Sequence, residues 1–430
     1  METGGTEGKQ QGTDGARWFA GPPAGHARSG AILLHEGKLE AAREEYELAL
    51  AADATSKHAH AGMYYALAGL GDQHAAAGHL ARALELEAVI GLGWRGVGTP
   101  VRVLLLLSIH AGNVLIQRFL NDRIFETHVV IMEFYEEWMP LPPHDLVING
   151  VGDADVRGEA LAAAERLLAH TWAPVINHPA AVGETGRCRN AERLARVEGL
   201  VTARTMTLAR SELSGPHAAA ALAARGFEFP LLLRAPGFHM GQHFVYVEDR
   251  SHVASRLGEL PGEELMVLQY LDGQGADGYI RKYRVLLIDG RFYPVHAAVS
   301  KHWKVHYFSA EMAEHGERRE EDARFLADME GVLGGSTMRV LERIQKELGL
   351  DYGGIDFGLN RKGEVLLFEA NATMAVYWPE ADARWDYRRP AVERIYSAVE
   401  RMLVKRAGKL TGGVEKRGDQ APAPVGVTGA

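Results

Sequence analysis

Cysteine is almost absent from this chain, since Cys188 is the only one in 430 residues. One cysteine excludes an internal disulfide framework and is typical of a reducing compartment. Nothing around Cys188 indicates a nucleophile, so we expect a packing or surface role for it. Long apolar runs are also missing. The longest, residues 101–109, is far too short to cross a bilayer.

The first sixteen residues lack the apolar core of a secretory signal and are rich in Gly, Thr, Gln and Glu. We therefore expect a cytoplasmic protein with no membrane partner. A basic surplus is missing as well, because 47 Lys and Arg stand against 56 Asp and Glu, for a net charge of −9. Sequence-independent binding of nucleic acid needs a basic surface, so we exclude nucleic acid as a general partner.

What remains is an ordinary globular composition, with 47% hydrophobic and 24% charged residues. The length allows two or three domains, each with its own core. Residues 1–24 and 406–430 show no periodicity, and the second of these segments mixes Gly, Pro, Ala and Lys. We predict that both segments are disordered or poorly ordered.

Residues 25–90 contain an internal repeat. Small and apolar residues recur at a constant offset of 34, with Gly37, Ala42, Tyr46, Ala49 and Leu50 matching Gly71, Ala76, Leu80, Ala83 and Leu84. This offset is the period of the tetratricopeptide repeat, a helix pair packed through small residues. Two repeats are fewer than the three or so that are stable alone, so we expect them to pack on a neighbouring domain or, in a homodimer, on a second subunit. A plain helical hairpin with a coincidental period is the alternative.

The next residues, Gly91-Leu-Gly-Trp-Arg-Gly96, formally match the dinucleotide-binding fingerprint. That fingerprint requires a strand before it and a helix after it, so that the helix N-terminus meets a phosphate. Here a predicted helix that ends at Val89 comes first and a strand-like run at 101–108 follows. We interpret the segment as a linker.

Two further domains follow the linker. Residues 98–200 alternate predicted strands with predicted helices, which indicates a small parallel α/β domain. Residues 201–405 contain short strands joined by turns and few helices, which indicates an α+β domain with mostly antiparallel sheet. We expect a multidomain protein with a helical N-terminus, an α/β layer and an α+β domain.

The clearest chemical pattern is a predicted hairpin that carries Gly-Ile-Asp356-Phe on one strand and Glu369-Ala-Asn371 on the other. The register set by its turn places 358 opposite 367 and Asp356 opposite Glu369. Glu369 and Asn371 are two residues apart and share one sheet face. Three oxygen-bearing side chains in one patch suit magnesium, which leaves coordination positions for phosphate oxygens. A surface-facing acidic pair is the alternative, and the apolar flanks disfavour it.

A cation and a glycine-containing loop precede this hairpin. Arg234 ends a predicted strand, and the loop that follows contains Gly237, His239 and Gly241. Glycines let backbone N–H groups approach phosphate, and arginine offers a planar fork to the same oxygens. Taken alone, a plain hairpin explains this segment more simply.

Cationic and polar residues also gather on the next two predicted strands. Arg281-Lys282-Tyr-Arg284 precedes the first, and the run from His296 to His306 occupies the second. We expect these segments to line a phosphate or carboxylate site. The candidate substrate contacts are Lys282, His296, Ser300, His302 and His306. Zinc is the alternative, although histidine spacings of six and four on an extended segment do not make a convincing tetrahedral site.

In order and spacing these features resemble the ATP-grasp superfamily, most of all its D-alanine–D-alanine ligase and RimK/glutathione-synthetase branch. The resemblance covers about residues 98–405. Asp356, Glu369 and Asn371 match the metal motif of the family. Arg284 matches an arginine that contacts the terminal phosphate and the acyl-phosphate intermediate, and we assign a catalytic role to Arg284 and Lys301.

The resemblance also implies nucleotide contacts. Gln269, Tyr270 and Leu271 fall at the adenine-binding linker, with Asp272 placed for the ribose, and Gly237 and Gly241 fall in the phosphate-covering loop. The family usually has lysine where this chain has Arg234 and, at a second position, Arg187 or Arg189. Arginine keeps the charge and binds phosphate bidentately, so we treat this difference as variation and include Arg189 among the nucleotide contacts.

The function implied by the resemblance is an ADP-forming ligase that uses ATP and two magnesium ions. A substrate carboxylate attacks the γ-phosphate, and an amine then displaces phosphate from the acyl phosphate. The implied partners are a small-molecule carboxylate and an amine, or a peptide. Two alternatives stay open: an ATP-grasp phosphotransferase that releases a phosphorylated product, and a tetratricopeptide adaptor whose nucleotide-binding part is not catalytic.

Overall fold

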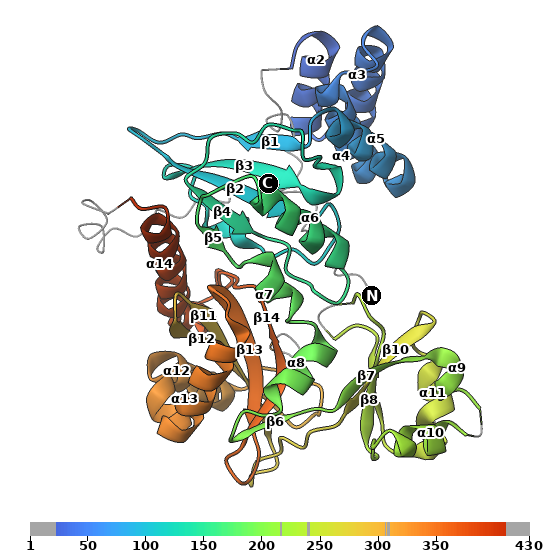
Figure 1. The fold of residues 1–430 in the computed structure, drawn as a ribbon, viewed down its shortest axis with the longest axis vertical. Helices are drawn as coiled ribbons and strands as arrows, with labels where there is room; N and C mark the ends of the chain where they lie inside the picture. The colour runs from blue at the N-terminus through green and yellow to red at the C-terminus, as the bar shows by residue number, and fades with distance from the viewer. Residues whose placement is uncertain (1–22, 216, 239–240, 306, 308–309, 410–430) are drawn as a thin grey trace.

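The computed structural model describes residues 23–215, 217–238, 241–305, 307 and 310–409. The predictions of disorder for 1–24 and 406–430 fall mainly outside these residues. Within them, a helical segment is followed by a mainly parallel sheet and then by two mainly antiparallel sheets (Figure 1). This confirms the predicted combination of helical, α/β and α+β parts.

Four helices form the N-terminal segment: α2 (Gly25–His35), α3 (Leu39–Ala52), α4 (Lys57–Leu70) and α5 (Gln73–Leu86). Both bounds of α5 lie 34 residues after those of α3, as the repeat predicts. Gly37 and Gly71 end the first helix of each pair with φ of +75° and +93°, a conformation in which glycine has no steric cost. The helices are confirmed, and the tetratricopeptide assignment stays a prediction.

The helical segment is fused to the sheet that follows it. Ala61, Ala83 and Leu84 belong to the same hydrophobic core as Ile90 and Val130. The expected packing on a neighbouring domain is therefore present. The linker interpretation was wrong at its start, because α5 already ends at Leu86 and β1 (Val89–Leu92) pairs antiparallel with β3 (Phe125–Ile131).

The first sheet has the strand order β1-β3-β2-β4-β5. Its remaining strands are β2 (Val101–Leu107), β3 (Phe125–Ile131), β4 (Leu146–Asn149) and β5 (Val175–Ile176). All pairs except β1–β3 are parallel, which confirms the α/β layer. Three helical elements accompany it: η2 (Ile116–Phe119), η3 (Met132–Phe134) and α6 (Gly158–Leu168). Because β2 and β4 run parallel, the loops after them, 108–113 and 150–157, lie at the same edge of the sheet.

A four-stranded sheet of order β7-β10-β8-β9 begins the α+β part. Its strands are β7 (Thr205–Ala209), β8 (Leu231–Arg234), β9 (Phe244–Val247) and β10 (Glu264–Gln269). Its short helices are α9 (Arg210–Leu213), α10 (Ala218–Ala224), η4 (Arg250–His252) and α11 (Val253–Leu257). All three strand pairs are antiparallel.

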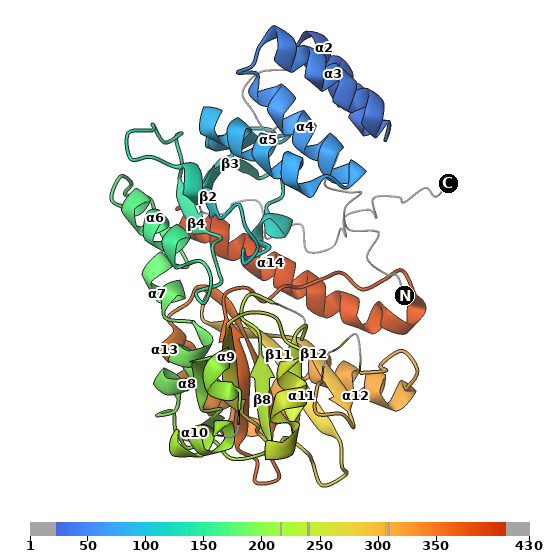
Figure 2. The ribbon, with the colours of Figure 1, turned by 90° about the vertical axis from the view of Figure 1, so that its right-hand side faces the viewer.

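A five-stranded sheet of order β12-β11-β13-β14-β6 completes the α+β part. Its strands are β6 (Leu200–Thr202), β11 (Ile280–Ile288), β12 (Arg291–Ser300), β13 (Tyr352–Leu359) and β14 (Val365–Asn371). Its helices are α12 (Gly316–Ala327), α13 (Met329–Leu348), η6 (Ala383–Arg388) and α14 (Arg389–Arg406). In Figure 2, α14 crosses the middle of the molecule, between the α/β layer and the two α+β sheets.

Aromatic packing decides which face of this sheet carries charge. Tyr283 of β11 and Phe357 of β13 stack at 5.4 Å between ring centroids, and Tyr283 packs on Phe325 of α12 at 5.1 Å. Side chains alternate along a strand, so Arg284 and Asp356 point to the opposite face. Figure 1 shows α12 and α13 on one side of the sheet and the four-stranded sheet on the other.

The chain passes from the α/β layer to the α+β sheets through α7 (Pro179–Gly183) and α8 (Arg187–Leu194). Asn177, just before α7, donates to the carbonyl of Tyr352 at 2.7 Å and accepts from its N–H at 2.9 Å. Asn149 of β4 donates to the carbonyl of Asn177 at 3.0 Å. These bonds fix the α/β layer to the start of β13. None of the described helices is both long and apolar enough to pass through a bilayer.

Candidate active site

A row of four side chains crosses the five-stranded sheet of the α+β part. The strand registers place Glu369 of β14 opposite Asp356 of β13, Asp356 opposite Arg284 of β11, and Arg284 opposite His296 of β12. Cross-strand neighbours share one face, so acid, acid, cation and imidazole follow one another across four strands. We call these four residues the charged row.

A bulge in the hairpin brings the two acids together. Near the turn, β13 and β14 pair Gly358 with Leu366, so the predicted register of 358 with 367 was wrong by one residue. The register then shifts at Phe368, which has no opposite residue, and Glu369 comes to lie opposite Asp356. The predicted pairing of the two acids is therefore confirmed.

Asp356 is held by two cations in a nearly closed environment. Arg284 donates from Nε to Oδ1 at 2.7 Å and from Nη2 to Oδ2 at 2.8 Å, and Lys282 donates to Oδ2 at 2.9 Å. The Asp356 side chain is only 2% exposed. Burial raises its pKa, but the charges of Arg284 and Lys282 outweigh burial, so the pKa lies below its usual range. Asp356 is therefore a carboxylate at neutral pH.

Glu369 is held by a different arginine. Arg187, the first residue of α8, donates from Nη2 to Oε1 of Glu369 at 2.6 Å and from Nη1 to Oδ2 of Asp155 at 2.6 Å. Burial raises the pKa of Glu369, and Arg187 and then Arg234 lower it further than burial raises it. Glu369 is also a carboxylate, bridged to the α/β layer through a guanidinium.

Arg234 brings the four-stranded sheet to the same place. It ends β8, its Nη2 donates to the carbonyl of Phe238 in the loop that follows, and it lies close enough to Arg187 and Glu369 to sense their charges. Burial and then Arg187 lower its pKa. In that loop Gly237 has φ +78° and approaches Val156 of the α/β layer. The first described residues of the predicted phosphate loop thus lie beside the charged row.

Two acids at the site were missed in the sequence. Asp153 and Asp155 lie in the loop 150–157 after β4, and both are near Arg187 and Arg234. Their position immediately after a buried strand of a parallel α/β sheet was a usable indication, because ligands bind at the carboxyl ends of such strands. The α/β layer therefore contributes charge to the site and does more than support it.

The three predicted metal residues have the right donors for magnesium. Two carboxylates and the amide oxygen of Asn371, which lies at the end of β14 two residues after Glu369, make an all-oxygen set. The Asn371 Oδ1 accepts from the N–H and the hydroxyl of Thr373 at 2.9 and 3.0 Å. Among the described residues, no three His, Cys, Asp or Glu side chains form a metal-binding group. The donor set fits magnesium with the amide as third ligand.

The predicted adenine segment lies at the end of β10. Gln269 is committed to the four-stranded sheet, with its side chain bonded to the backbone of Glu228 at 2.9 and 3.0 Å. Tyr270 packs edge-on against Tyr246 of β9 at 5.3 Å, and burial raises the pKa of Tyr270 to about 12. Leu271 is half-buried and Asp272 is exposed, accepting from the backbone N–H of Gln274.

An aromatic and cationic patch extends from this segment. Tyr246 also packs on Trp303 at 5.6 Å, and Lys304 lies against Gly241 of the glycine loop and donates to the carbonyl of Phe244 at 3.5 Å. Aromatic faces of this kind suit a nucleobase, and Lys304 suits phosphate. The structure thus brings Gly241 and Tyr270 to one neighbourhood.

Several predicted residues lie apart from the charged row. Arg189 is on the exposed side of α8 and pairs with Glu184, so Arg187 is the arginine of this pair that reaches the site. Lys301 is exposed, with its ammonium 5.2 Å from the ring centroid of Tyr279. Ser300 accepts from the N–H of exposed His302 at 3.1 Å. His239 and His306 lie outside the described residues.

His296, at the end of the charged row, is buried. Its ring lies 4.8 Å from that of Tyr307, and its Nε2 has no hydrogen-bond partner among the described residues. Burial and then Arg284 lower its pKa well below the usual range, so the imidazole is neutral at pH 7. A neutral, buried ring here is compatible with the predicted substrate contact.

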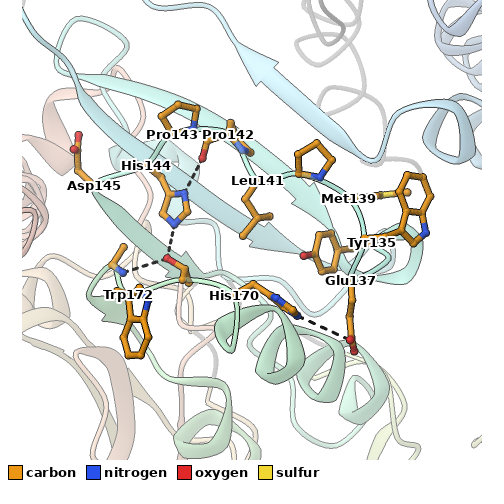
Figure 3. Close-up of a pocket in the computed structure, with 14 residues that line it drawn as sticks. Tyr135, Glu137, Met139, Leu141, Pro142, Pro143, His144, Asp145, His170 and Trp172 are labelled. Atoms are coloured by element: carbon orange, nitrogen blue, oxygen red, sulfur yellow. Dashed lines mark hydrogen bonds and ion pairs between the residues drawn. The ribbon is translucent and has the colours of Figure 1, made fainter.

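A cavity of about 720 Å³ lies elsewhere in the molecule (Figure 3). It is formed by residues 135–145, which lead into β4, and 170–173, which lead into β5. Trp138 and Trp172 line it and are 78% and 103% exposed, and His144 is bonded to Thr171 at 2.6 Å. None of the predicted site residues lines it, and it adjoins the amino ends of parallel strands, whereas ligands of such sheets bind at the carboxyl ends.

No protein-family model and no curated protein matches the sequence. Among solved structures, the D-alanine–D-alanine ligase from Coxiella burnetii is similar over 72% of this chain and 96% of its own, with 12% identity and a TM-score of 0.45. For the D-alanyl-alanine synthetase A from Vibrio cholerae the values are 73%, 98%, 15% and 0.46. For the ATP-grasp ligase PsnB, solved with precursor peptide PsnA2 and AMPPNP, they are 72%, 100%, 17% and 0.40. These low values describe a broad likeness of fold.

Proposed function

We propose that this protein is an ATP-dependent carboxylate–amine ligase of the ATP-grasp type, which activates a carboxylate as an acyl phosphate and releases ADP and phosphate. The observation that carries the proposal is the charged row, in which two ionised carboxylates, the buried Asp356 and the partly buried Glu369, are each held by an arginine. Burying such charges is costly for stability, so their concentration on one sheet face indicates chemistry.

Asp356, Glu369 and Asn371 are the residues that would hold magnesium. The ion supplies Lewis-acid stabilisation of the charge on the nucleotide phosphates. Arg284, Arg234 and Arg187 would supply further positive charge to the nucleotide phosphates. This combination suits phosphoryl transfer, which depends on positioning and electrostatic stabilisation.

The reaction has two steps. A carboxylate oxygen of the substrate forms a bond to the γ-phosphorus while the bond to the bridging β-γ oxygen breaks, which yields acyl phosphate and ADP. The amine nitrogen then bonds to the acyl carbon, phosphate leaves, and the nitrogen loses a proton. Arg284 and Arg234 stabilise the charge on the transferred group. The loop that contains Gly237 covers the phosphates and excludes water, which would hydrolyse the acyl phosphate.

The nucleobase would stack at the Tyr270 and Tyr246 patch, so ATP would lie between the two α+β sheets. The carboxylate and amine substrates, or a peptide, would enter from the side of the α/β layer, whose loop 150–157 carries Asp153 and Asp155 beside Arg187. The helical segment is fused to that layer on the side of β1.

The test is a screen of carboxylate and amine pairs, peptides included, with ATP and magnesium, scored by ADP release and product mass. The carboxylate of any active pair is then labelled with ¹⁸O. We expect an amide product and transfer of one ¹⁸O atom to the released phosphate, because the acyl carbon–oxygen bond breaks when the amine attacks. A phosphorylated product without an amide would overturn the ligase in favour of a phosphotransferase.

A further inference from the structure

We propose that Asp155 is a positioning residue for this reaction. It holds the guanidinium of Arg187 against Glu369, and in this way the α/β layer sets the orientation of a cation that meets the nucleotide phosphates. The inference rests on the proposed function and extends it to a residue outside the two α+β sheets.

One carboxylate grips Arg187 at two points. Oδ1 of Asp155 accepts from the backbone N–H of Arg187 at 3.0 Å, and Oδ2 accepts from Nη1 at 2.6 Å. The far side of the same guanidinium donates from Nη2 to Glu369 at 2.6 Å. Because both the start of α8 and the planar fork are fixed, the cation has one orientation in place of many rotamers.

The three residues come from three separate parts of the fold. Asp155 lies in the loop after β4, Arg187 begins α8, and Glu369 is on β14. Gly186 is needed for the approach, since a Cβ at this position would lie 2.9 Å from Oδ1 of Asp155. The neighbouring Val156 lies near Gly237, since a Cβ added to that glycine would be 3.9 Å from Val156 Cγ1.

A purely structural ion pair is the competing explanation, and the attachment of α8 argues against it. Asn190, one turn further along α8, donates to the carbonyl of Ala370 at 2.7 Å and to that of Thr185 at 3.1 Å. The bond to Ala370 already joins the helix to β14 without Asp155. What Asp155 adds is the direction of the guanidinium.

The test is a double-mutant cycle on the full chain with Asp155→Asn, Arg187→Ala and the double variant. The readout is the affinity for magnesium-AMPPNP by calorimetry, which needs no knowledge of the acceptor. We expect Asp155→Asn to weaken binding about ten- to a hundredfold, the range for losing a charge-assisted hydrogen bond. In the Arg187→Ala background, Asp155→Asn should change the affinity less than twofold.

Matched variants keep the result interpretable. Glu184→Gln removes an acid from an arginine pair on the exposed side of the same helix and should leave affinity unchanged. Gly186→Ala displaces the Asp155 carboxylate without changing Asp155 itself, so it should weaken binding as Asp155→Asn does. It tests the inference even if Asp155→Asn folds poorly. Gly186 has φ −54°, which alanine tolerates.

Two results separate failure of this inference from failure of the proposed function. Wild-type protein that does not bind magnesium-AMPPNP would overturn the proposed function and this inference with it. If the wild type binds, unchanged or tighter binding by Asp155→Asn would overturn this inference alone. The same holds if the double variant loses affinity by the product of the two single losses, because the two residues would then act independently.

Discussion

The two five-stranded sheets of this molecule are similarly buried and differently filled. In the α/β layer, β2 buries Val103, Leu104, Leu105 and Leu106 completely. In the α+β part, β11 buries Val285 to Leu287 just as completely, yet it carries Lys282 and Arg284 beside them. An apolar strand gains stability from burial, whereas buried charges need partners merely to offset their desolvation. The difference indicates that the first sheet is built for stability and that one face of the second is built for chemistry.

The largest effect of a single substitution on activity is expected at Glu369. We expect Glu369→Gln to reduce ADP formation about a thousandfold or more, because the site loses an anionic oxygen where phosphate charge must be stabilised. Stability should change little, since Arg187 keeps its pair with Asp155. Initial rates and thermal unfolding of the same samples check both halves, and wild-type turnover would contradict the metal assignment.

Asp356→Asn is the informative companion to this variant. It should also abolish ADP formation, but it leaves Arg284 and Lys282 buried beside a neutral amide. Removing one partner of a buried ion pair typically costs about 3–5 kcal/mol. Loss of activity with loss of stability is therefore expected here, in contrast to Glu369→Gln.

In the sheet of the α/β layer we expect the reverse, a loss of stability without a loss of activity. Leu105→Ala empties a fully buried position in β2 and should lower the free energy of unfolding by about 2–5 kcal/mol. Activity per folded molecule should stay within a factor of two. Leu107→Ala, at a partly buried position on the same strand, is the control and should cost less. Urea unfolding measures both, and an equal cost would contradict the assigned burial.

Asp322 is another buried carboxylate of the α+β part, and its protonation makes the stability of the protein depend on pH. Asp322 of α12 accepts from Tyr387 at 2.7 Å and from the N–H of Ala297 at 2.7 Å, and burial raises its pKa to about 6. A folded-state pKa above the unfolded value means that the folded protein binds more protons between the two. Asp322 should therefore lower the free energy of unfolding as pH rises from 4 to 7, by roughly 2–3 kcal/mol.

The variant Asp322→Asn lacks this proton. The free energy of unfolding of the variant minus that of the wild type should increase by that amount between pH 4 and pH 7, because only the wild type loses stability. Urea titrations of both proteins at each pH give the difference directly. A constant difference would show that Asp322 is ionised with an ordinary pKa.

The smallest expected effects lie in the helical segment. A Cβ on Gly62 of α4 would overlap the ring of Tyr46, so Gly62→Ala should destabilise the protein by about 1–3 kcal/mol. At Gly78 of α5 nothing lies within 4 Å of an added Cβ, and Gly78→Ala should stabilise the helix by about 0.5–1 kcal/mol. Opposite signs in thermal unfolding are the expected result, and equal signs would contradict the packing around Tyr46.

Local patterns predicted much of this fold. The alternation of strands and helices gave the α/β layer, and the 34-residue offset gave the four helices with their glycine turns. The acidic hairpin was predictable because its sequence fixes which side chains share a face. Its bulge at Phe368 was not, since a one-residue register shift depends on packing between strands rather than on the turn.

The missing part of the site depends on tertiary contacts. Asp155 and Arg187 are 32 residues apart and meet Glu369 only because α8 is docked on β14. Nothing in the local sequence distinguishes Arg187 from Arg189, and only the face of α8 that each occupies separates them.

The central claim is that the charged row binds magnesium-nucleotide. Its most direct test is calorimetric titration of AMPPNP into the wild type and Glu369→Gln, each with magnesium and with a chelator. We predict saturable binding by the wild type only with magnesium, and a loss of about tenfold or more in folded Glu369→Gln. Equal binding in all four titrations, or wild-type binding that is the same with magnesium and with the chelator, would contradict the assignment of the charged row as a magnesium-nucleotide site.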